Sequence, residues 1–481
     1  MPIAVISVAQ MREWEQATWA SGQTEESVMR LAGRAVAHRA AQLTHPGDCV
    51  LVLAGKGHNG DDAKFAAESE LLAQREVSLV RVLDPKSARA EIAALLLRAP
   101  ALIIDGLFGI GLNRPLSDPW INLIREINQS SAPILAVDVP SGLNAQTGDP
   151  LEDAIHATHT ITFGAVKEGM LQTRAVAFIG QLEVATDIGL VPCPFKTELN
   201  CSVAEDFLRF PPPRPTNGHK GTFGHLALIA GSLGYHGASV LAARGAQRAQ
   251  PGLVTLFTSE NVYQPVAGQL QSVMVHPWAA DMGLPDSCTA IAIGPGLASR
   301  DLPEYIRETT RRLWKQSRLP LIVDASALAW LPPGPFPPQA VRVITPHPGE
   351  AARLLESTTA EVQAHRPQAL RKLSQRFGNC FVVLKGHQTL VGRAEAEVFI
   401  NSSGNSFLAQ GGSGDLLTGY LGGLLAQPAL QDDPLKTICY AVWQHGAAAD
   451  LLLSTRPNWT VEDLAVMVGS AKLDRLPSSM E

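Results

Sequence analysis

Residues 49–60 read Cys-Val-Leu-Val-Leu-Ala-Gly-Lys-Gly-His-Asn-Gly, an apolar run that leads directly into a glycine-rich turn. The apolar run predicts a buried β-strand, and a helical pattern follows the turn. Glycines at such a turn let the backbone approach a ligand, and the free N–H groups of a helix N-terminus can bind phosphate. A tight turn without any ligand would explain the same residues. The stretch therefore indicates a strand–turn–helix unit, and it leaves the function open.

The same alternation extends through both halves of the chain. Strands are expected at 49–54, 77–83, 101–105 and 133–138, with helices near 24–43, 61–75, 88–98 and 119–129. In the second half, strands are expected at 225–230, 253–258, 290–293, 320–324, 341–345 and 380–385, with a hairpin in 387–401. Alternating strands and helices predict an α/β fold, with parallel sheets that carry helices on both faces.

The amino-acid composition is typical of a globular protein. The 481 residues are 46% hydrophobic and 17% charged, with a formal net charge of −6. This balance favours a globular chain and gives no basic surface for nucleic acid. The most apolar stretch, residues 93–111, is interrupted by Arg98, Pro100 and Asp105, so we expect no membrane span and no membrane partner.

The cysteines and the beginning of the chain bear on the compartment. None of the six cysteines forms a CxxC pair, and Cys49 and Cys380 open apolar runs, so buried free thiols are favoured over a metal or redox role. The first residues lack a basic segment followed by a long apolar one, so we expect no signal peptide. We expect a cytoplasmic protein.

A proline-rich segment divides the chain. Residues 192–220 contain six prolines and little periodicity, between two stretches that each look like a complete α/β domain. We expect a first domain over 1–195, a linker over 196–215 and a second domain over 216–475.

Polar residues end several strands of the first domain. Because the carboxyl ends of parallel strands share one edge of a sheet, Asn59, Asp105, Asp138 and Ser141 are expected to converge on one crevice. An aspartate at a strand end can also be only a helix or turn cap. Several such ends with flanking glycines favour a binding site.

Six motifs of the first domain resemble the NAD(P)H-hydrate epimerase domain. They are SVAQMRE (7–13), VMRLAGRAVA (28–37), GKGHNGDDA (55–63), DGLFGIGLNRP (105–115), VDVPSGLNAQTG (137–148) and TFGAVKEG (162–169). The resemblance implies a Rossmann-like doubly wound sheet that binds hydrated NADH or NADPH. It implies that Asn59, Asp105 and Ser141 bind K⁺, and that Asp138 gives acid–base help. The implied substrate contacts are His58, Asn59, Gly60, Asp61, Asp62, Gly109, Ile110, Gly111, Leu112, Asn113, Arg114, Pro115 and Asp138.

The first loop departs from the pattern of that family. His58 stands where the family has Asn, and Asp61 and Ala63 stand where it has Gly. A carboxylate at Asp61 is expected to repel the phosphates of a dinucleotide if it faces them. A solvent-facing or helix-capping Asp61 is the alternative.

The second half contains its own glycine cluster, GNSFLAQGGSGD (404–415), at the start of an apolar helix. Consecutive N–H groups there can form an anion hole for a phosphoryl group, and Asp415 in the first turn can act as a base toward a hydroxyl. An aspartate that only complements the helix dipole is the alternative. His347 and Glu350 follow another strand, and Lys385 ends a third, where it can meet nucleotide phosphate. No GxxxxGK[ST] motif occurs, so a P-loop enzyme is excluded.

The second half resembles the ADP/ATP-dependent NAD(P)H-hydrate dehydratase domain of the ribokinase-like superfamily. The segments are KGTFGHLALIAGS (220–232), IGPGL (293–297), VDASAL (323–328), TPHPGEAARLL (345–355), VVLKGHQTLV (382–391) and GGSGDLLTG (411–419). The resemblance implies that Ala238, Gly296, His347 and Asp415 contact the hydrated cofactor. It implies an adenine nucleotide held by Lys385, Gly386, His387, Gln388 and Thr389 and by Gly411, Gly412, Ser413 and Gly414.

The domain order resembles that of bifunctional NAD(P)H-hydrate repair enzymes. This implies epimerisation of R and S hydrates by the first domain and dehydration of the S hydrate by the second, with ADP, or ATP as the alternative, and with Mg²⁺ and K⁺. We also expect a homo-oligomer. Two alternatives stay open: a small-molecule kinase of ribokinase type, and a non-catalytic regulatory first domain.

Overall fold

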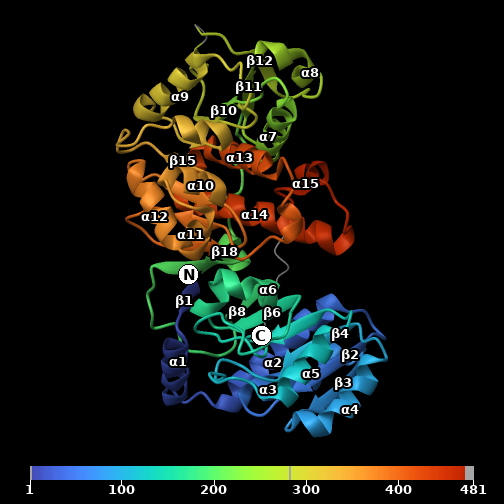
Figure 1. Cartoon of the computed structure of the whole chain (residues 1–481). Helices are drawn as coiled ribbons and strands as arrows, with labels where there is room; N and C mark the ends of the chain where they lie inside the picture. Colours follow the sequence, from blue (N-terminus) through green and yellow to red (C-terminus); the bar gives the residue numbers. More distant parts are fainter. Residues whose placement is uncertain (1–2, 281–282, 472–481) are drawn as a thin grey trace. The chain divides into compact units, whose positions relative to one another are not determined.

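The computed structural model describes residues 3–280 and 283–471, and it forms two compact units, Met1–Cys201 and Ser202–Glu481 (Figure 1). Among these residues no helix is long and apolar enough to cross a membrane. Residues 196–215, expected as a linker, contain strand β9 (Leu199–Ser202) and a buried side chain, Phe207. The proline-rich composition of this segment therefore does not keep it free of regular structure.

The first unit is a doubly wound α/β sheet with a small second sheet. Its strands are β1 (Ile3–Ile6), β2 (Cys49–Ala54), β3 (Glu76–Arg81), β4 (Leu102–Gly106), β5 (Ile134–Val137), β6 (His159–Phe163), β7 (Val166–Lys167), β8 (Gln181–Ala185) and β9. Its helices are α1 (Val8–Ala20), α2 (Glu25–Leu43), α3 (His58–Ala67), α4 (Pro85–Leu96), α5 (Asp118–Asn128) and α6 (Val176–Ile179).

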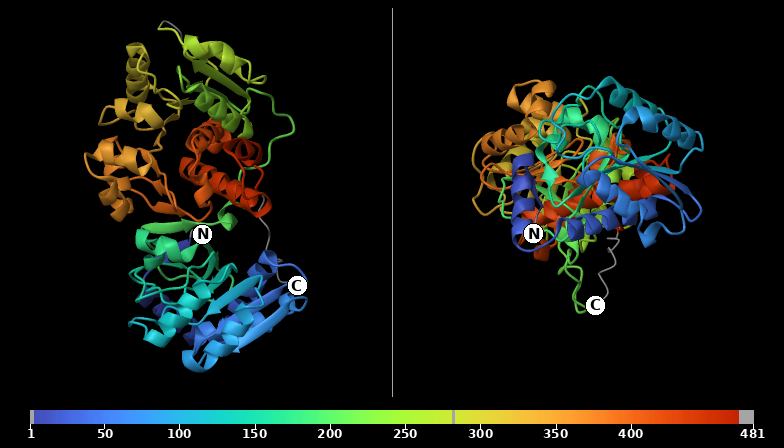
Figure 2. Two further views of the ribbon diagram at one scale, coloured as in Figure 1. Left: turned by 45° about the vertical axis from the view of Figure 1, so that its right-hand side comes forward. Right: turned by 90° about the horizontal axis from the view of Figure 1, so that it is seen from below.

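The main sheet of this unit has the order β3-β2-β4-β5-β6-β8, and all its neighbouring strands are parallel. The chain moves outward in opposite directions from β2 and β4, so their carboxyl ends form the switch point where doubly wound sheets bind ligands. The loop after β2 and the loop after β4 therefore border one crevice. Helices α2 and α3 pack on one face and α4 and α5 on the other (Figure 2).

Helix α1 is fixed at both its start and its middle. Ser7 caps it through a reciprocal pair of hydrogen bonds with Gln10, and Met11, Trp14 and Thr18 are buried. The indole Nε1 of Trp14 donates to the carbonyl oxygen of Val191 at 2.8 Å. Strand β1, just before this helix, pairs in parallel with β7 and antiparallel with β9.

The second unit is a larger α/β sheet. Its strands are β10 (His225–Ile229), β11 (Leu253–Thr258), β12 (Met274–Pro277), β13 (Ala290–Ile293), β14 (Leu321–Val323), β15 (Arg342–Ile344), β16 (Phe381–Leu384), β17 (Leu390–Gly392) and β18 (Val398–Asn401). Its helices are α7 (His236–Arg248), α8 (Tyr263–Ala267), α9 (Glu304–Gln316), α10 (Pro348–Leu355), α11 (Thr359–Ala364), α12 (Arg366–Arg376), α13 (Ser413–Leu425), α14 (Pro434–Thr455) and α15 (Val461–Met467).

Strands β12-β11-β10-β13-β14-β15-β16 lie in that order and are parallel, and β17 and β18 add the expected antiparallel hairpin. The switch point of this sheet lies between β10 and β13. The core on one face joins the sheet to α7, α13, α14 and α15. On the other face the buried Arg342 of β15 donates from Nε to the carbonyl oxygen of Trp314 in α9 at 2.9 Å. Both units confirm the expected α/β class.

Candidate functional sites

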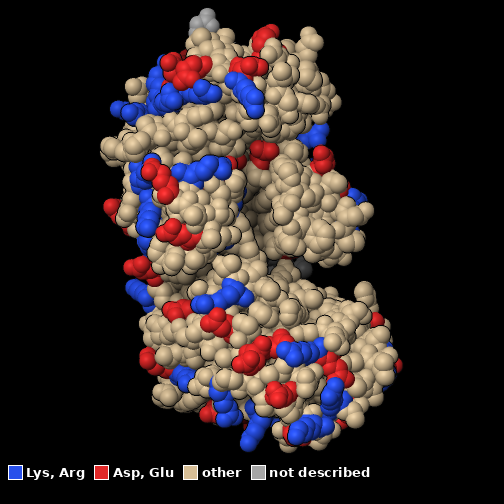
Figure 3. Space-filling view, in the orientation of Figure 1, with Lys and Arg blue, Asp and Glu red and all other residues tan. Residues whose placement is uncertain are grey.

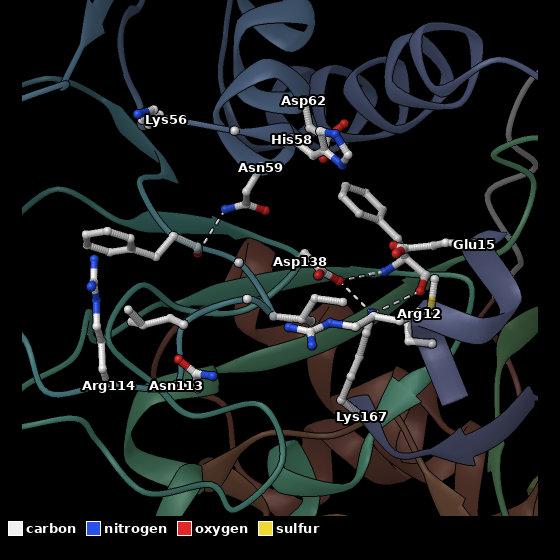
Figure 4. A pocket seen from close by; sticks show the side chains of 18 residues that line it. Arg12, Glu15, Lys56, His58, Asn59, Asp62, Asn113, Arg114, Asp138 and Lys167 are labelled. Carbon is white, nitrogen blue, oxygen red and sulfur yellow. Dashed lines mark hydrogen bonds and ion pairs between the residues drawn. The ribbon is translucent and has the colours of Figure 1, made fainter. Parts of the chain in front are cut away.

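A cavity of about 600 Å³ opens at the switch point of the first unit (Figure 4). Its lining residues come from α1, from the start of α3, from the loops after β2, β4 and β5, and from β6 and β7. Ten of the expected substrate contacts border it: His58, Asn59, Asp62, Gly109, Ile110, Gly111, Leu112, Asn113, Arg114 and Asp138. Met11, Arg12, Glu15, Lys56, Gly57, Phe108, Phe163 and Lys167 complete the lining. The volume is in the range of small-molecule sites.

Asp138 is the most constrained acidic residue at this cavity. Asp138 directly follows β5, its backbone φ of 63° is left-handed, and the residue is 7% exposed. Its Oδ1 atom accepts hydrogen bonds from Lys167 Nζ at 2.6 Å, Thr162 Oγ1 at 3.0 Å and the Phe163 N–H at 3.2 Å. Non-glycine residues with positive φ are uncommon and concentrate at functional sites.

Lys167 is the cationic partner of that carboxylate. Its side chain is fully buried, and its ammonium donates to Asp138 Oδ1, to Thr162 Oγ1 at 2.8 Å and to the carbonyl oxygen of Phe163 at 3.0 Å. All three ammonium donors are thus used. A buried, fully bonded ammonium stabilises a negative charge on Asp138 and fixes the position of its carboxylate.

Two further carboxyl groups at the cavity have raised pKa values. Burial, and next the negative charge of Asp138, raise the pKa of Glu15. Burial also raises the pKa of Asp62 well above its ordinary value, with smaller contributions from Asp138 and Asp61. The cavity therefore combines a carboxylate that is paired with a cation and carboxyl groups that retain a proton more readily.

Asp105 and Ser141 lie beneath the cavity lining rather than in it. Asp105 is fully buried, and its oxygens accept from Ser141 Oγ at 2.6 Å, the Ser141 N–H at 2.8 Å and the Leu107 N–H at 3.2 Å. Ser141 Oγ accepts from the Phe108 N–H at 2.8 Å, and Asn59 Nδ2 donates to the carbonyl oxygen of Phe108 at 2.9 Å. The structure thus brings the three expected K⁺ ligands together around one backbone segment.

Gly60, Asp61 and Pro115 are not among the residues that line the cavity. A Cβ atom at Gly60 would lie 2.1 Å from the carbonyl oxygen of Gly55, so this glycine is required for close packing of the loop. Asp61 Oδ1 accepts from Arg81 at 2.9 Å. Asp61 is thus paired with a guanidinium from β3, and the expected repulsion between its carboxylate and dinucleotide phosphates stays a prediction.

In the second unit the glycine cluster opens α13 as expected. Gly412 is the N-cap residue, with a φ of 99° that favours glycine, and Asp415 lies in the first turn. Burial raises the pKa of Asp415 to about 7, with a further contribution from the charge of Asp324. A carboxyl group with this pKa is half ionised at neutral pH, which suits a general base.

Lys385 links the glycine cluster to two other carboxylates. Its Nζ lies 2.8 Å from Asp324 Oδ1 and 4.0 Å from Glu350 Oε2. A Cβ atom at Gly414 would lie 3.3 Å from the same Nζ, so the ammonium adjoins the start of α13. Thr418 Oγ1 donates to the other oxygen of Asp324 at 2.7 Å. These contacts hold one ammonium beside the N–H groups that would meet a phosphoryl group.

His347 is the N-cap of α10, and its orientation follows from that role. Its Nδ1 accepts from the N–H groups of Gly349 and Glu350 at 3.1 and 3.3 Å, while Glu350 Oε2 accepts from the His347 N–H at 2.8 Å. Burial lowers the pKa of His347, although the charge of Glu350 opposes this effect. A neutral imidazole whose Nδ1 accepts hydrogen bonds carries its proton on Nε2, which lies 3.5 Å from Glu350 Oε1.

The remaining expected residues lie on loops at the carboxyl ends of the strands. The backbone of the segment 385–389 is held by Arg366, which donates to the carbonyl oxygens of His387 at 2.9 Å and Gln388 at 3.4 Å. Ala238, in the first turns of α7, lies against Gly296: a Cβ atom on that glycine would be 2.9 Å from Ala238 Cβ. Both residues adjoin the switch point between β10 and β13.

Comparisons with known proteins agree with this pair of sites. The family model described as NAD(P)H-hydrate dehydratase matches residues 226–467, and the YjeF-related protein N-terminus matches residues 25–99 and 85–169. The bifunctional NAD(P)H-hydrate repair enzyme Nnr of Gloeobacter violaceus is 34% identical over 487 residues, which cover 93% of this chain and 93% of that protein. The chain belongs to the family of bifunctional NAD(P)H-hydrate repair enzymes.

A second bifunctional enzyme and one solved dehydratase structure are also similar to this chain. The Escherichia coli K12 enzyme is 36% identical over 424 residues, covering 84% of this chain and 80% of that protein. The ADP/ATP-dependent NAD(P)H-hydrate dehydratase from Bacillus subtilis, co-crystallised with ATP and Mg²⁺, is 32% identical and covers 53% of this chain and 91% of that chain, with a TM-score of 0.48. The resemblance expected from the motifs of both halves is confirmed.

Several residues that the structure places at the two sites were not predicted from the sequence. In the first unit they include Glu15, Lys56 and Lys167, and in the second Asp324 and Arg366. Lys167 lies within the quoted run TFGAVKEG, and Asp324 begins VDASAL. Asp324 ends the expected strand 320–324, a signal that could have singled it out, whereas Lys167 lies beside no expected strand.

Proposed function

We propose that this chain repairs hydrated NADH and NADPH by two successive reactions, epimerisation in the first unit and ADP-dependent dehydration in the second. One observation carries the dehydration step: Asp415, whose pKa burial raises to about 7, lies in the first turn of a glycine-capped helix beside the ammonium of Lys385. Family membership supports the same pair of reactions.

The dehydration follows from the chemistry of the substrate. Hydration leaves a hydroxyl on carbon 6 of the nicotinamide ring, beside the ring nitrogen. Asp415 would remove the hydroxyl proton as the oxygen attacks the β-phosphorus of ADP, with AMP as the leaving group. The nitrogen lone pair then expels phosphate, and loss of a carbon 5 proton restores the dihydropyridine.

The surrounding residues would stabilise the charge that develops during phosphoryl transfer. The N–H groups of Gly411, Gly412, Ser413 and Gly414 and the ammonium of Lys385 would meet the phosphoryl oxygens. Asp324 holds that ammonium in place. Mg²⁺ bound with the nucleotide would neutralise phosphate charge, and Glu350 offers a carboxylate of the kind that binds it. The segment 385–389, fixed by Arg366, would hold the adenine nucleotide.

The first unit would bind the hydrated dinucleotide in its cavity of about 600 Å³. Asp138 would give acid–base help, and K⁺ would organise the loops around Asn59, Asp105 and Ser141. The donor set fits a cation: its carbonyl, carboxylate and hydroxyl oxygens are hard ligands. Asp105 is also fully buried with only neutral hydrogen-bond donors around its carboxylate, and burial raises its pKa to about 6. An adjacent cation would supply the positive charge that this carboxylate lacks.

The ligands we propose are small molecules, and we place the chain in the cytoplasm, where its six free cysteines fit a reducing compartment. Acidic and basic side chains are interspersed over the face of the protein drawn in Figure 3. The expected homo-oligomer stays a prediction that sedimentation of the full chain would test.

The experiment that separates this proposal from a small-molecule kinase uses the pure S hydrate with ADP and Mg²⁺. We expect the absorbance of reduced nicotinamide to appear together with equal amounts of AMP and inorganic phosphate. Accumulation of a stable phosphorylated product, or no ADP consumption, would contradict the proposal.

A further inference from the structure

Glu15 is positioned by a rigid helix at the wall of the first unit's cavity. Helix α1 is capped by Ser7 and anchored by buried Trp14, and Glu15 is the next residue. In Figure 4 its side chain extends from α1 toward Asp138 and Lys167. Among the described residues, no hydrogen bond or ion pair engages its carboxyl group. A fixed but unengaged carboxyl group at a ligand cavity is available to a bound molecule.

The charges around Glu15 come from several elements. Asp138 follows β5, Lys167 belongs to β7, His58 begins α3, and Arg12 lies one turn earlier on α1. Burial raises the pKa of Glu15 most, Asp138 raises it further, and the three basic groups oppose this with smaller effects. The net direction is upward, so the carboxyl group of Glu15 holds a proton more strongly than an ordinary glutamate does.

Asp138 differs from Glu15 in its hydrogen-bond partners. Its Oδ1 atom accepts three hydrogen bonds, one of them from the buried ammonium of Lys167 at 2.6 Å. Within residues 3–280 and 283–471, its Oδ2 atom accepts none, and the side chain lines the cavity. The cavity thus presents a charge-paired carboxylate with one free oxygen, and a second carboxyl group from α1 that has no protein partner among the described residues. Two carboxyl groups in such different environments are typical of an acid and base pair.

We propose that Glu15 is the proton donor, and Asp138 the proton acceptor, of the epimerisation. The assignment rests on the epimerase activity proposed above for the first unit. The assignment identifies the acid as a residue of α1 and gives this helix a role in the wall of the cavity.

The substrate is a cyclic hemiaminal, so exchange of one proton opens its ring. Asp138 takes the proton of the carbon 6 hydroxyl, and the O–H electron pair forms the C6=O bond. The C6–N1 bond breaks with its electron pair on N1, and Glu15 gives its proton to that nitrogen. The product is a ring-opened aldehyde, with Asp138 protonated and Glu15 ionised.

Ring closure reverses these transfers on the other face. The aldehyde turns about the C5–C6 bond and N1 attacks its opposite face. The N–H proton returns to Glu15, and the new alkoxide takes the proton from Asp138. Configuration at carbon 6 is inverted, no atom is gained or lost, and both carboxyl groups regain their starting states. The hydroxyl oxygen and N1 share one carbon, so a single small cavity can present the acid and the base together.

Two neighbouring groups are weaker choices for this acid. His58 has a half-exposed ring, with its Nε2 3.3 Å from Glu25 Oε2 outside the cavity lining. Asp62 also has a raised pKa, but its Oδ1 atom is buried away from solvent without a hydrogen-bond partner. Glu15 alone combines a side chain directed toward Asp138 with an unengaged carboxyl group.

The test uses the full chain without ADP, so that dehydration is silent, and starts from the pure R hydrate. Appearance of the S hydrate is followed by chromatography, with the spontaneous rate subtracted. Glu15→Gln replaces the carboxyl group by an amide of the same size that cannot serve as the acid. We expect its kcat for epimerisation to fall about 10²–10⁴-fold while KM stays within about twofold of the wild-type value. Glu15→Asp should recover at least about tenfold over Glu15→Gln, because it keeps an ionisable proton.

Three controls make the outcomes distinct. Glu13→Gln, at an exposed position of the same helix, should epimerise at the wild-type rate. ADP-dependent dehydration of the S hydrate should be unchanged in all variants. If the wild-type chain does not epimerise, the proposed function of the first unit fails. If the wild-type chain epimerises and Glu15→Gln keeps its kcat, or if Asp62→Asn abolishes turnover while Glu15→Gln does not, the assignment of Glu15 is overturned.

Discussion

The pH dependence of dehydration tests the role of Asp415 most closely. Burial raises the pKa of this carboxyl group from its ordinary value of 3.8 to about 7. A base acts in its ionised form, so the rate should increase as pH rises through the pKa of Asp415. The ionised fraction is about one eleventh at pH 6 and about ten elevenths at pH 8, which predicts a roughly tenfold rise in kcat/KM between them. A group with the ordinary pKa would give a flat profile.

The assay is a single turnover of the S hydrate with saturating ADP and Mg²⁺, followed by the absorbance of reduced nicotinamide across this pH range. Asp415→Asn should lower the rate about 10²–10⁴-fold and remove the titration, while epimerisation stays intact. Glu350→Gln should shift the midpoint downward, since the charge of Glu350 helps to raise the pKa of Asp415. A glutamine there can still accept from the His347 N–H.

Asp432→Asn is the matched control, because this aspartate is exposed after α13. It should leave both rate and midpoint unchanged. Near wild-type turnover by Asp415→Asn, or a flat profile in the wild-type chain, would refute the assignment of Asp415 as the base.

Three further outcomes follow from the first unit and the division of the chain. K⁺ should raise the melting temperature of the wild-type chain more than that of Asp105→Asn. Calorimetry with choline as the control cation measures this difference, and an equal rise in both proteins would argue against the ion site. Asp61→Gly should change the affinity for the hydrated dinucleotide by no more than about twofold. It should lower the free energy of unfolding by at most about 1 kcal/mol, because it removes a partly exposed ion pair with Arg81. Tighter binding at low salt would instead support repulsion between Asp61 and the dinucleotide phosphates. Cleavage directly after β9, where the two units divide, should give two soluble pieces with separate melting transitions, and aggregation of both pieces would count against two independent domains.

Local sequence was sufficient to predict strands whose residues are uniformly buried. Strand β2 coincides with the expected range 49–54, because five of its six residues are buried on both faces of a parallel sheet. Strand β12 was missed since its residues alternate between exposed and half-buried at the edge of the sheet. Strand β6 was missed because its sequence, His-Thr-Ile-Thr-Phe, contains hydroxyl groups that only tertiary contacts satisfy: Thr160 Oγ1 donates to the carbonyl oxygen of Ile179 at 2.7 Å.

The candidate sites, too, could be predicted only in part from the sequence. Asn59, Asp105 and Ser141 converge as the order of parallel strands predicts. The pairing of Asp61 with Arg81 depends on the register of β3 beside α3, and no local pattern encodes it. The approach of Glu15 to Asp138 joins residues more than 120 positions apart through the docking of α1, which only the folded chain supplies.

The central claim is that one chain carries out both reactions, and a mixture of R and S hydrates with ADP tests it directly. The wild-type chain should convert the whole mixture to reduced nicotinamide cofactor faster than the spontaneous interconversion of the epimers allows. Glu15→Gln should stop at the S fraction and then proceed at the spontaneous rate, and Asp415→Asn should equilibrate the epimers without forming reduced cofactor. Recovery by the wild-type chain that halts at the S fraction, or a phosphorylated hydrate that persists, would contradict the account.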